Sequence, residues 1–579
     1  MKNTDITTPG IRFTEGGIFR IRERFNKMLK LFLLAAVALG LVSCSKDFLD
    51  RGSKVVFSDE NFWTSEGNVK SYCWEFYNLF AGYGTGTNGD FYFTTFTDDQ
   101  AARSMDLFPT TAPASNSHWD YTYIRKANLL LERVPEMSVL SSEAAAHYLG
   151  IARFFRAFEY ANLVRHFGDV PYINEYLDQS NLDAIYAPRT PRAVVVDSIM
   201  ADLQFAASNV RSIARNKSLG DLNMVSQEVV WAYMGRVALY EGTYARYVTG
   251  DEGRAVALLQ IAREASAKII GSNSFTLTPV YKDLYSSLDL GNNPEVLLYK
   301  SYVSGILTHS VIGYTNSSTM MSGLTKDAVD SFLCSDGLPI SLSALYEGNG
   351  NISQVLANRD LRLVQSVAGE LAYIGNPNDK GFTSSTGYVI TKFNNGSLGA
   401  SEVLAPNNPT DAPIFWLAEV LLNYAEASAE LGVLTQTDLD ATINLLRARG
   451  GVAPLILASV PDDPIRDSDV SPLLWEIRRE RRSELIMDGF REWDIRRWGK
   501  LSYLDPSVKP AIFQGAYLGM HDVSLPDGLT LSSDGHILPY GAGVGRDVEI
   551  PKNYLDAIPT GELTLYQLRG VPFPQNPGW

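Results

Sequence analysis

Two glutamates on one predicted helix, Glu419 and Glu426, are the residues whose spacing most readily suggests catalysis. They lie seven residues apart, so both carboxylates face the same side of the helix. Paired carboxylates carry out glycoside hydrolysis, one as general acid and the other as nucleophile or base. With 65 acidic residues in the chain, however, such a pair is expected by chance. The apolar stripe along the same helix and an arginine-rich segment later in the chain favour a salt-bridged scaffold instead.

That arginine-rich segment, Trp475–Lys500, reads WEIRRERRSELIMDGFREWDIRRWGK and holds eight basic residues, six acidic residues and three tryptophans. Basic runs with interleaved aromatic residues can bind nucleic acid. The local positive excess is small, and the whole chain carries a net charge of −15, so a polyanion would be repelled. We therefore predict no nucleic-acid partner. We interpret the segment as two helices whose Arg and Glu side chains pair with one another, because a planar guanidinium satisfies two acceptors at once.

Metal and cysteine chemistry find little support. The three cysteines, Cys44, Cys73 and Cys334, form no CxxC motif, and the six histidines form no HExxH motif. Asp98 and Asp99 are adjacent carboxylates that could hold calcium, but they lack the DxDxDG spacing of a calcium-binding loop. We expect no cofactor and no resident metal, and the sequence leaves open whether Cys73 and Cys334 pair.

The amino-terminal region has the features of an export signal. Leu31–Val42 reads LFLLAAVALGLV and follows Lys27 and Lys30. Twelve apolar or small residues are too few to cross a bilayer, but they match the hydrophobic region of a signal peptide. The following Leu41-Val42-Ser43-Cys44 resembles a bacterial lipobox, in which the cysteine is acylated and becomes the first mature residue.

This pattern sets the expected domain organisation. We predict a signal peptide over residues 1–43, of which 1–27 could be an extension before a true start at Met28. The mature chain, residues 44–579, is expected to be a single domain tethered to a membrane by lipid on Cys44.

Apolar residues recur at helical spacing through much of this chain. Thr190-Pro191 is typical of a helix start, and Thr435–Asp438 resembles a capping box. The expected helices cover residues 141–167, 190–210, 225–244, 254–270, the stripe from Ile414 to Leu431, 439–449, and a segment that Ser471-Pro472 opens. Their lengths suit the antiparallel helix pairs of tetratricopeptide-like repeats.

The remaining segments lack helical periodicity. We expect the helical scaffold mainly in residues 119–271 and 414–499, and loop-rich regions at 82–118, 274–410 and 500–579. Loops of this length are usually functional or carry small sheets.

Several sequence blocks occur in a characteristic order. They are Asp47-Phe48-Leu49-Asp50, Trp119-Asp120-Tyr121, Phe167-Gly168-Asp169-Val170-Pro171, LAEVLLNYAEA at Leu417–Ala427, ERRSEL at Glu480–Leu485, WDIRRWG at Trp493–Gly499 and the terminal Gln575-Asn576-Pro577-Gly578-Trp579. Together they resemble the SusD/RagB family of outer-membrane nutrient-binding lipoproteins, from Cys44 to Trp579. Trp416 and Leu361 depart from that pattern, where the family commonly has Arg and Pro.

The resemblance implies a mostly α fold: tetratricopeptide-like helix pairs, a SusD-like α/α superhelix, support a loop-rich ligand-binding half with minor β structure. It also implies a glycan-binding protein on the outer face of the outer membrane, acting as the lid of a SusC-like TonB-dependent transporter and performing no catalysis. Some members of the family bind peptides. A peptide-binding lid, a glycan-degrading enzyme and a helical adaptor that binds only the transporter remain the alternatives.

The family's ligand residues vary, so we looked for loops that suit sugars. Sugar rings stack on aromatic side chains, and their hydroxyl groups bond to amides and carboxylates. The candidates are Tyr83, Asn88, Asp90, Tyr92, Asp98, Tyr314 and Asn316. The alternative is that these loops are ordinary turns. By the same resemblance, Arg481, Arg482, Arg496 and Arg497 should pair with scaffold acids such as Glu419, Glu426 or Glu484.

Overall fold

The computed structural model describes residues 62–85, 96–178, 180–316, 322–378, 381–519 and 525–579. Contacts divide the chain into two units, Met1–Ser65 and Glu66–Trp579, and the second contains all the elements below. The predicted signal peptide and Cys44 lie outside the described residues.

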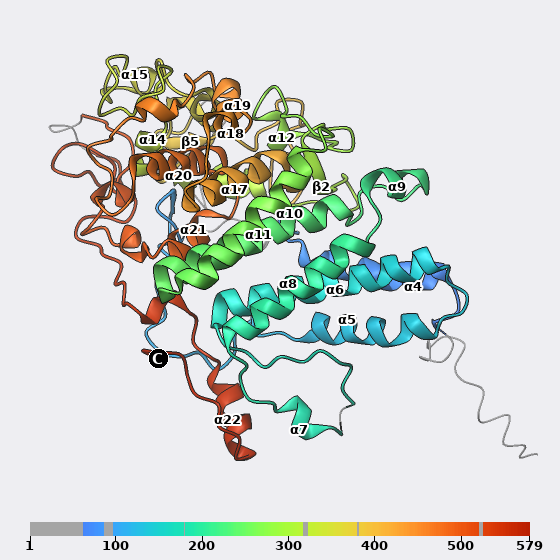
Figure 1. Cartoon of the computed structure of the whole chain (residues 1–579). Helices are drawn as coiled ribbons and strands as arrows, with labels where there is room; N and C mark the ends of the chain where they lie inside the picture. The colour runs from blue at the N-terminus through green and yellow to red at the C-terminus, as the bar shows by residue number, and fades with distance from the viewer. Residues whose placement is uncertain (1–61, 86–95, 179, 317–321, 379–380, 520–524) are drawn as a thin grey trace, which may run out of the picture. The chain divides into compact units, whose positions relative to one another are not determined.

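Helices dominate the second unit (Figure 1). The longer ones are α4 (Glu66–Trp74), α5 (Thr122–Arg133), α6 (Ser142–Phe167), α8 (Arg192–Asn209), α10 (Gln227–Tyr244), α11 (Glu252–Ile270), α17 (Leu417–Glu430), α20 (Pro472–Glu484) and α22 (Thr560–Leu568). The shorter ones are α7 (Leu182–Ile185), α9 (Ile213–Ser218), α12 (Asp283–Ser286), α13 (Val311–Asn316), α14 (Lys326–Ser331), α15 (Ile352–Leu356), α16 (Leu361–Ser366), α18 (Gln436–Asp440), α19 (Ile443–Arg449) and α21 (Arg491–Arg497).

The long helices pack in sequence: α5 on α6, α6 on α8, α8 on α10, α10 on α11, α11 on α17, and α17 on α20. Small residues permit the closest of these contacts, because a Cβ on Gly235 of α10 would lie 2.9 Å from Ser266 Oγ of α11. Ala238, Leu259 and Ala427 are fully buried where α10, α11 and α17 meet. The prediction of a scaffold built from packed helix pairs is confirmed.

Local signals account for most helix ends. Ser141 accepts a hydrogen bond from the Ala144 amide at the start of α6, and Gly168 ends that helix with φ of 72°. At α18, Thr435 and Asp438 form the predicted capping box.

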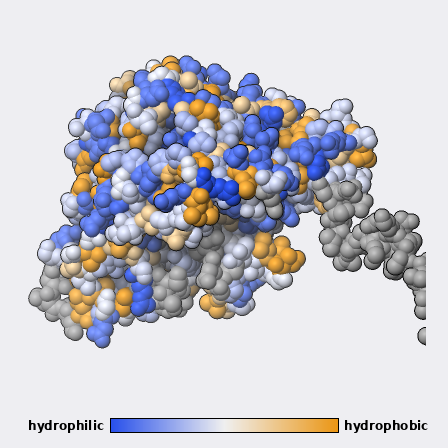
Figure 2. All heavy atoms as spheres, turned by 90° about the horizontal axis from the view of Figure 1, so that it is seen from below, coloured by the Kyte–Doolittle hydropathy of each residue, from blue (hydrophilic) through white to orange (hydrophobic). Residues whose placement is uncertain are grey.

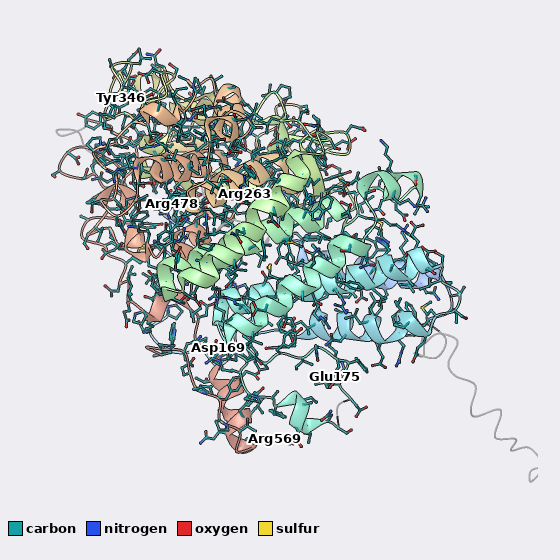
Figure 3. All side chains as sticks on the ribbon, in the orientation of Figure 1. Asp169, Glu175, Arg263, Tyr346, Arg478 and Arg569 are labelled. Atoms are coloured by element: carbon teal, nitrogen blue, oxygen red, sulfur yellow. The ribbon has the colours of Figure 1, made fainter. Side chains whose placement is uncertain are left out.

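The start of α8 differs from the prediction. Pro191 precedes the helix instead of occupying its first turn, and the Thr190 amide and carbonyl pair with Val170. The cap comes from Asp169, whose Oδ1 accepts from the Arg192 amide at 2.7 Å. Figure 3 shows Asp169 at the end of α6, beside the start of α8. A residue in the turn that follows α6 therefore caps α8.

Two helices expected late in the chain are shorter than predicted. Ile414 belongs to a strand, and α17 begins at Leu417. The expected helix 439–449 is interrupted at Thr442, whose hydroxyl donates to the Asp438 carbonyl at 2.6 Å. Such a local side-chain bond competes with helical geometry.

Strands are short and join distant segments. In the described residues they form three antiparallel two-stranded sheets: β1 (Gln100–Ala102) with β3 (Ser322–Leu324), β2 (Val296–Lys300) with β6 (Ala412–Trp416), and β4 (Val367–Leu371) with β5 (Tyr388–Ile390). The mostly α fold with minor β structure in the loop-rich part is therefore confirmed. Turns of 3₁₀ helix occupy Glu75–Leu79, Val134–Glu136, Leu457–Ser459, Leu501–Leu504, Pro510–Phe513 and Lys552–Tyr554, and a π-helical turn, Ala245–Thr249, continues α10.

Within the described part of the chain, no helix combines the length and the apolar character needed to cross a bilayer. On the face drawn in Figure 2, hydrophobic residues form small separate groups among hydrophilic ones.

Candidate functional site

The arginine-rich segment forms α20 and α21, and its charges are buried in ion pairs, as predicted. Arg497 donates to both oxygens of Glu426 at 2.6 and 2.7 Å. Arg481 and Arg497 each hold one oxygen of Asp494 at 2.8 Å. These two helices are a frame that ties α17 to the carboxyl-terminal part of the chain.

Other predicted pairings in this frame are wrong. Glu419 pairs with Arg236 of α10, with both contacts at 2.6 Å. Glu484 pairs with Arg362 and Arg449. Each carboxylate pairs with the arginine that lies nearest to it in the fold, and the separation of the two residues in the sequence does not predict the pair.

Asp98, a predicted ligand residue, belongs to the same frame. Its side chain is fully buried, and Arg491 donates to both of its oxygens at 2.7 Å. Burial opposes its ionisation, but Arg482 and Arg491 outweigh that effect and lower the pKa of Asp98. Asp99 also pairs with Arg482, at 2.7 Å. These arginines occupy the carboxylates that could have held calcium, and the described residues contain no cluster of three or more His, Cys, Asp or Glu side chains placed to hold a metal.

Tyr83 is likewise part of the core. It is 0% exposed, and its hydroxyl donates to the Tyr285 carbonyl at 3.0 Å. The structure therefore does not support Tyr83 or Asp98 as ligand contacts, because neither side chain is accessible.

Most of the other candidates remain predictions. Asn88, Asp90 and Tyr92 lie outside the described residues. Tyr314, on α13, is partly exposed. Asn316 is fully buried and its Nδ2 donates to Asn394 Oδ1 at 2.9 Å, so the structure does not support it as a ligand contact, for the same reason as Tyr83 and Asp98. Cys73 and Cys334 are buried free thiols, so the possibility that they form a disulfide is not realised.

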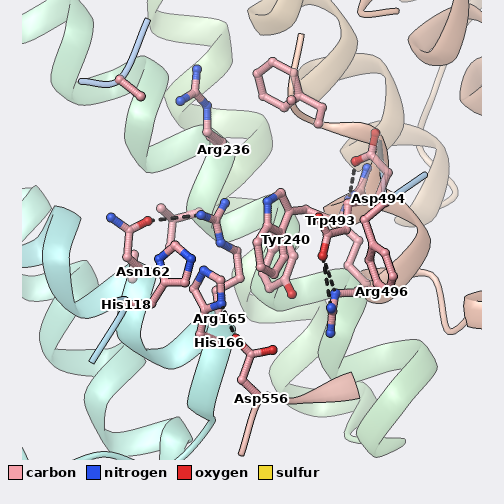
Figure 4. Close-up of a pocket in the computed structure, with 18 of the residues that line it drawn as sticks. His118, Asn162, Arg165, His166, Arg236, Tyr240, Trp493, Asp494, Arg496 and Asp556 are labelled. Atoms are coloured by element: carbon pink, nitrogen blue, oxygen red, sulfur yellow. Dashed lines mark hydrogen bonds and ion pairs between the residues drawn. The ribbon is translucent and has the colours of Figure 1, made fainter. Parts of the chain in front are cut away.

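The described residues enclose a cavity of about 850 Å³, shown in Figure 4. Helices α6, α10 and α21 supply much of its wall, and segments near residues 106–118 and 553–557 complete it. The lining includes His118, Asn162, Arg165, His166, Arg236, Tyr240, Trp493, Arg496 and Asp556. This volume lies in the range of small-molecule sites, about 300–1,000 Å³.

Aromatic rings meet at close range in this cavity. His118 stacks on His166 with 3.9 Å between ring centroids, and Trp493 meets His166 edge-on at 4.9 Å. Tyr240 also packs edge-on near Trp493, at 6.4 Å. Rings arranged beside amide and imidazole groups suit a sugar, which has both apolar faces and hydroxyl groups.

The titratable groups around these rings have shifted pKa values. Burial lowers the pKa of His166 to about 4, against the opposing effect of Asp556, whose Oδ2 lies 2.8 Å from His166 Nδ1. Just behind the wall, burial raises the pKa of Glu159 to about 7. Asn162 donates to Glu159 at 3.3 Å. His166 is therefore neutral at pH 7 and offers hydrogen bonds without a charge.

Most carboxylates of the wall are engaged in ion pairs. Glu241 accepts from Arg192 at 2.9 and 2.8 Å. Glu492 accepts from Arg496 at 3.0 Å, and Asp494 is shared by two arginines. Carboxylates held in this way serve structure, and the arrangement suits binding better than acid–base chemistry.

Sequence reasoning missed this cavity. Trp493 stands in one of the blocks that carry the family resemblance, but Arg165 and His166 close an ordinary helix, and His118 lies in a loop. No periodicity connects these positions. Their convergence depends on how α6 meets α21.

Comparisons with known proteins agree with this architecture. A family profile described as "SusD family" matches residues 302–524, and one described as "Starch-binding associating with outer membrane" matches residues 53–239. The SusD-like protein P38 of Formosa agariphila is 24% identical over 82% of this chain and 92% of its own length.

Solved structures show the same fold. A SusD-like carbohydrate-binding protein from Bacteroides fragilis matches with a TM-score of 0.66 and 21% identity, covering 87% of this chain and 99% of its own. A laminarin-binding SusD-like protein matches with a TM-score of 0.53 and 19% identity, covering 89% and 100%. The two profile matches together span more than half of the sequence, and the chain belongs to the SusD family.

Proposed function

We propose that this protein binds oligosaccharides in the cavity between α6, α10 and α21, without cleaving them. The observation that carries the proposal is the cavity itself: aromatic rings and neutral or amide hydrogen-bonding groups line a space of about 850 Å³. The similarity to SusD-like carbohydrate-binding and laminarin-binding proteins supports a glycan as the ligand.

The wider role that we propose is nutrient capture at the cell surface. The protein would be held in the outer membrane by lipid on Cys44 and would pass its ligand to a SusC-like TonB-dependent transporter. The lipobox-like Leu41–Cys44 supports the anchor. The family description "associating with outer membrane" supports the location.

Binding can be tested with a soluble form that begins after Cys44. Calorimetric titration with a panel of oligosaccharides and peptides should find an oligosaccharide that binds, and mass spectrometry should find its chain length unchanged. Release of shorter fragments would show an enzyme instead. Binding of peptides but of no oligosaccharide would show that the ligand is a peptide.

The place of the site can be tested with a matched pair of tryptophans. Trp493→Leu should weaken binding at least tenfold, because Trp493 lines the cavity. Trp475→Leu is the control: this residue lies on α20 outside the cavity wall. The loop variants Tyr92→Ala and Tyr314→Ala should keep full affinity. If the loop variants lose binding while Trp493→Leu keeps it, the site lies in the loops predicted from sequence.

A further inference from the structure

Arg165 differs from every other arginine of the cavity wall. Arg236 holds Glu419, Arg496 holds Glu492, and Arg481 and Arg497 share Asp494. Arg165 forms no salt bridge with any carboxylate in the part of the chain that the structure describes. It is a cation at a cavity wall without a counter-ion.

The surroundings of Arg165 leave its charge largely uncompensated. The guanidinium lies 3.8 Å from the centre of the Trp493 ring, and Nη2 donates to Asn162 Oδ1 at 3.2 Å. Nε is buried and has no hydrogen-bond partner among the described residues. Burial lowers the pKa of Arg165, and the opposing effects of Tyr240, Tyr233 and Glu492 are smaller.

Most acids of the wall are held by other cations. Glu241 is held by Arg192, Asp488 by Lys392 and Glu492 by Arg496. Asp556 is hydrogen-bonded to His166, and Glu492 offsets only part of the effect of burial on the pKa of Arg165. Asp106 also lines the cavity, and its backbone carbonyl accepts a hydrogen bond from Arg546. Arg165 is half-buried and has no counter-ion among the described residues, so an anion from outside the chain would be a favourable partner.

Further donors in the wall also lack partners. The Trp416 indole Nε1 and the Asn553 Nδ2 are buried and make no hydrogen bond to any described residue. Native proteins leave few such groups unsatisfied. The buried side-chain groups of this wall that lack a partner are therefore mainly N–H donors.

We propose that Arg165 receives the anionic group of an acidic sugar, a carboxylate or a sulfate, so that the ligand of this cavity is an acidic oligosaccharide. This inference rests on the proposed function and names the class of its ligand. Trp493 covers one face of the guanidinium, so the ligand meets its nitrogen edge, where a fork of donors matches two oxygens of an anion. The net charge of −15 does not prevent this contact, because ions screen distant charges beyond about 8–10 Å.

The test compares acidic glycans with their neutral counterparts on the soluble protein. The probes are oligogalacturonates and their carboxyl-reduced forms, and sulfated galactan oligosaccharides and their desulfated forms. At least one acidic probe should bind ten times or more tightly than its neutral counterpart, and its affinity should fall as salt is raised. The pair that shows the difference identifies the anion as carboxylate or sulfate.

Variants at Arg165 then assign the contact. Arg165→Met keeps the stem against Trp493 but removes the charge, and it should reduce affinity for the acidic probe at least tenfold and affinity for the neutral one much less. Arg165→Lys keeps the charge but loses the planar fork, so its affinity for the acidic probe should lie between the affinities of the wild type and of Arg165→Met. The control is Arg153→Met: Arg153 also lies on α6, stacks on an aromatic ring (Phe205, 4.1 Å) and has an unsatisfied Nε, but it is outside the cavity wall.

The possible failures are distinct. Equal binding of acidic and neutral probes, unchanged in Arg165→Met, overturns the acidic ligand and leaves glycan binding in place. Selective binding of acidic probes that Arg165→Met does not alter overturns the role of Arg165. Absence of binding by every glycan overturns both proposals. A thermal melt of each variant excludes loss of folding as the cause of lost affinity.

Discussion

Replacing Glu426 with glutamine tests whether the arginine-rich helices are a structural frame. The side chain is 0% exposed, and its two oxygens accept three hydrogen bonds: from Arg497 at 2.6 and 2.7 Å, and from the Trp498 indole at 2.8 Å. Glutamine has the same shape, but it removes the charge and turns an N–H group toward a donor. Arg497 would keep only Asp494 as a counter-ion.

The expected loss follows from breaking a buried pair. Removing one partner of such a pair usually costs about 3–5 kcal/mol, because the other charge stays buried and uncompensated. Whole domains are stable by only about 5–15 kcal/mol, so this loss is readily measured. Urea denaturation followed by tryptophan fluorescence should show a lower midpoint with an unchanged slope.

The stability that Glu426 contributes should decrease at low pH. Burial opposes ionisation of Glu426, but Arg497 and Arg481 outweigh that effect and lower its pKa. The folded protein then binds fewer protons than the unfolded chain, so this stabilisation is present above the unfolded pKa of about 4.3 and is lost as pH falls below it. The difference between the wild type and Glu426→Gln should hold from pH 7 to 5 and narrow at lower pH.

The control is Glu132→Gln, at an exposed position where the glutamate pairs with Arg133. Exposed pairs contribute about 0–1 kcal/mol, so this change should have little effect. A loss below about 1 kcal/mol for Glu426→Gln as well would refute the view that these ion pairs hold the frame together.

Other predictions concern single groups. Burial raises the pKa of Glu159 to about 7, so between about pH 4.3 and 7 the unfolded chain loses this proton while the folded protein keeps it, and the wild type becomes less stable as pH rises through that range. Relative to the wild type, Glu159→Gln should gain roughly 3 kcal/mol in the free energy of unfolding between pH 4 and 8, measured by urea titrations, and parallel pH profiles would contradict this. Cys44→Ala should leave the protein unlipidated and absent from the membrane fraction, whereas continued surface labelling would disprove the anchor. Cys73 and Cys334, both buried, should react with a thiol reagent only after denaturation, and rapid reaction of the native protein would show that one of them is accessible.

Much of the helical fold could be predicted because its signals are local. A capping box such as Thr435–Asp438 involves neighbouring residues, and an apolar stripe shows the face that each helix buries. The predicted helix ends were wrong where a residue outside the helix determines them. Asp169 caps α8 from the preceding turn, and Ile414 pairs in a β-strand instead of belonging to α17.

The predicted ligand residues illustrate the same limit. The loop around Asp98 has the composition of a binding site, yet Arg482 and Arg491, nearly four hundred residues later in the chain, pair with its carboxylate. The composition of this loop suggested that Asp98 lies at a polar surface. Whether a residue is buried depends on the fold of the whole chain, and the fold places Asp98 among the ion pairs of the frame.

By itself, the sequence predicted an export signal and determined the helical periods and the family resemblance, because each depends on neighbouring residues or on the order of motifs along the chain. It also showed that the charges of Trp475–Lys500 nearly balance. Only the tertiary structure decided which acid each arginine holds, since ion pairs form between groups that meet in space. Where α6 meets α21, Arg165 lies in the cavity wall against Trp493 and forms no salt bridge with a described carboxylate. This position makes α6, a helix of the scaffold, part of the candidate binding site.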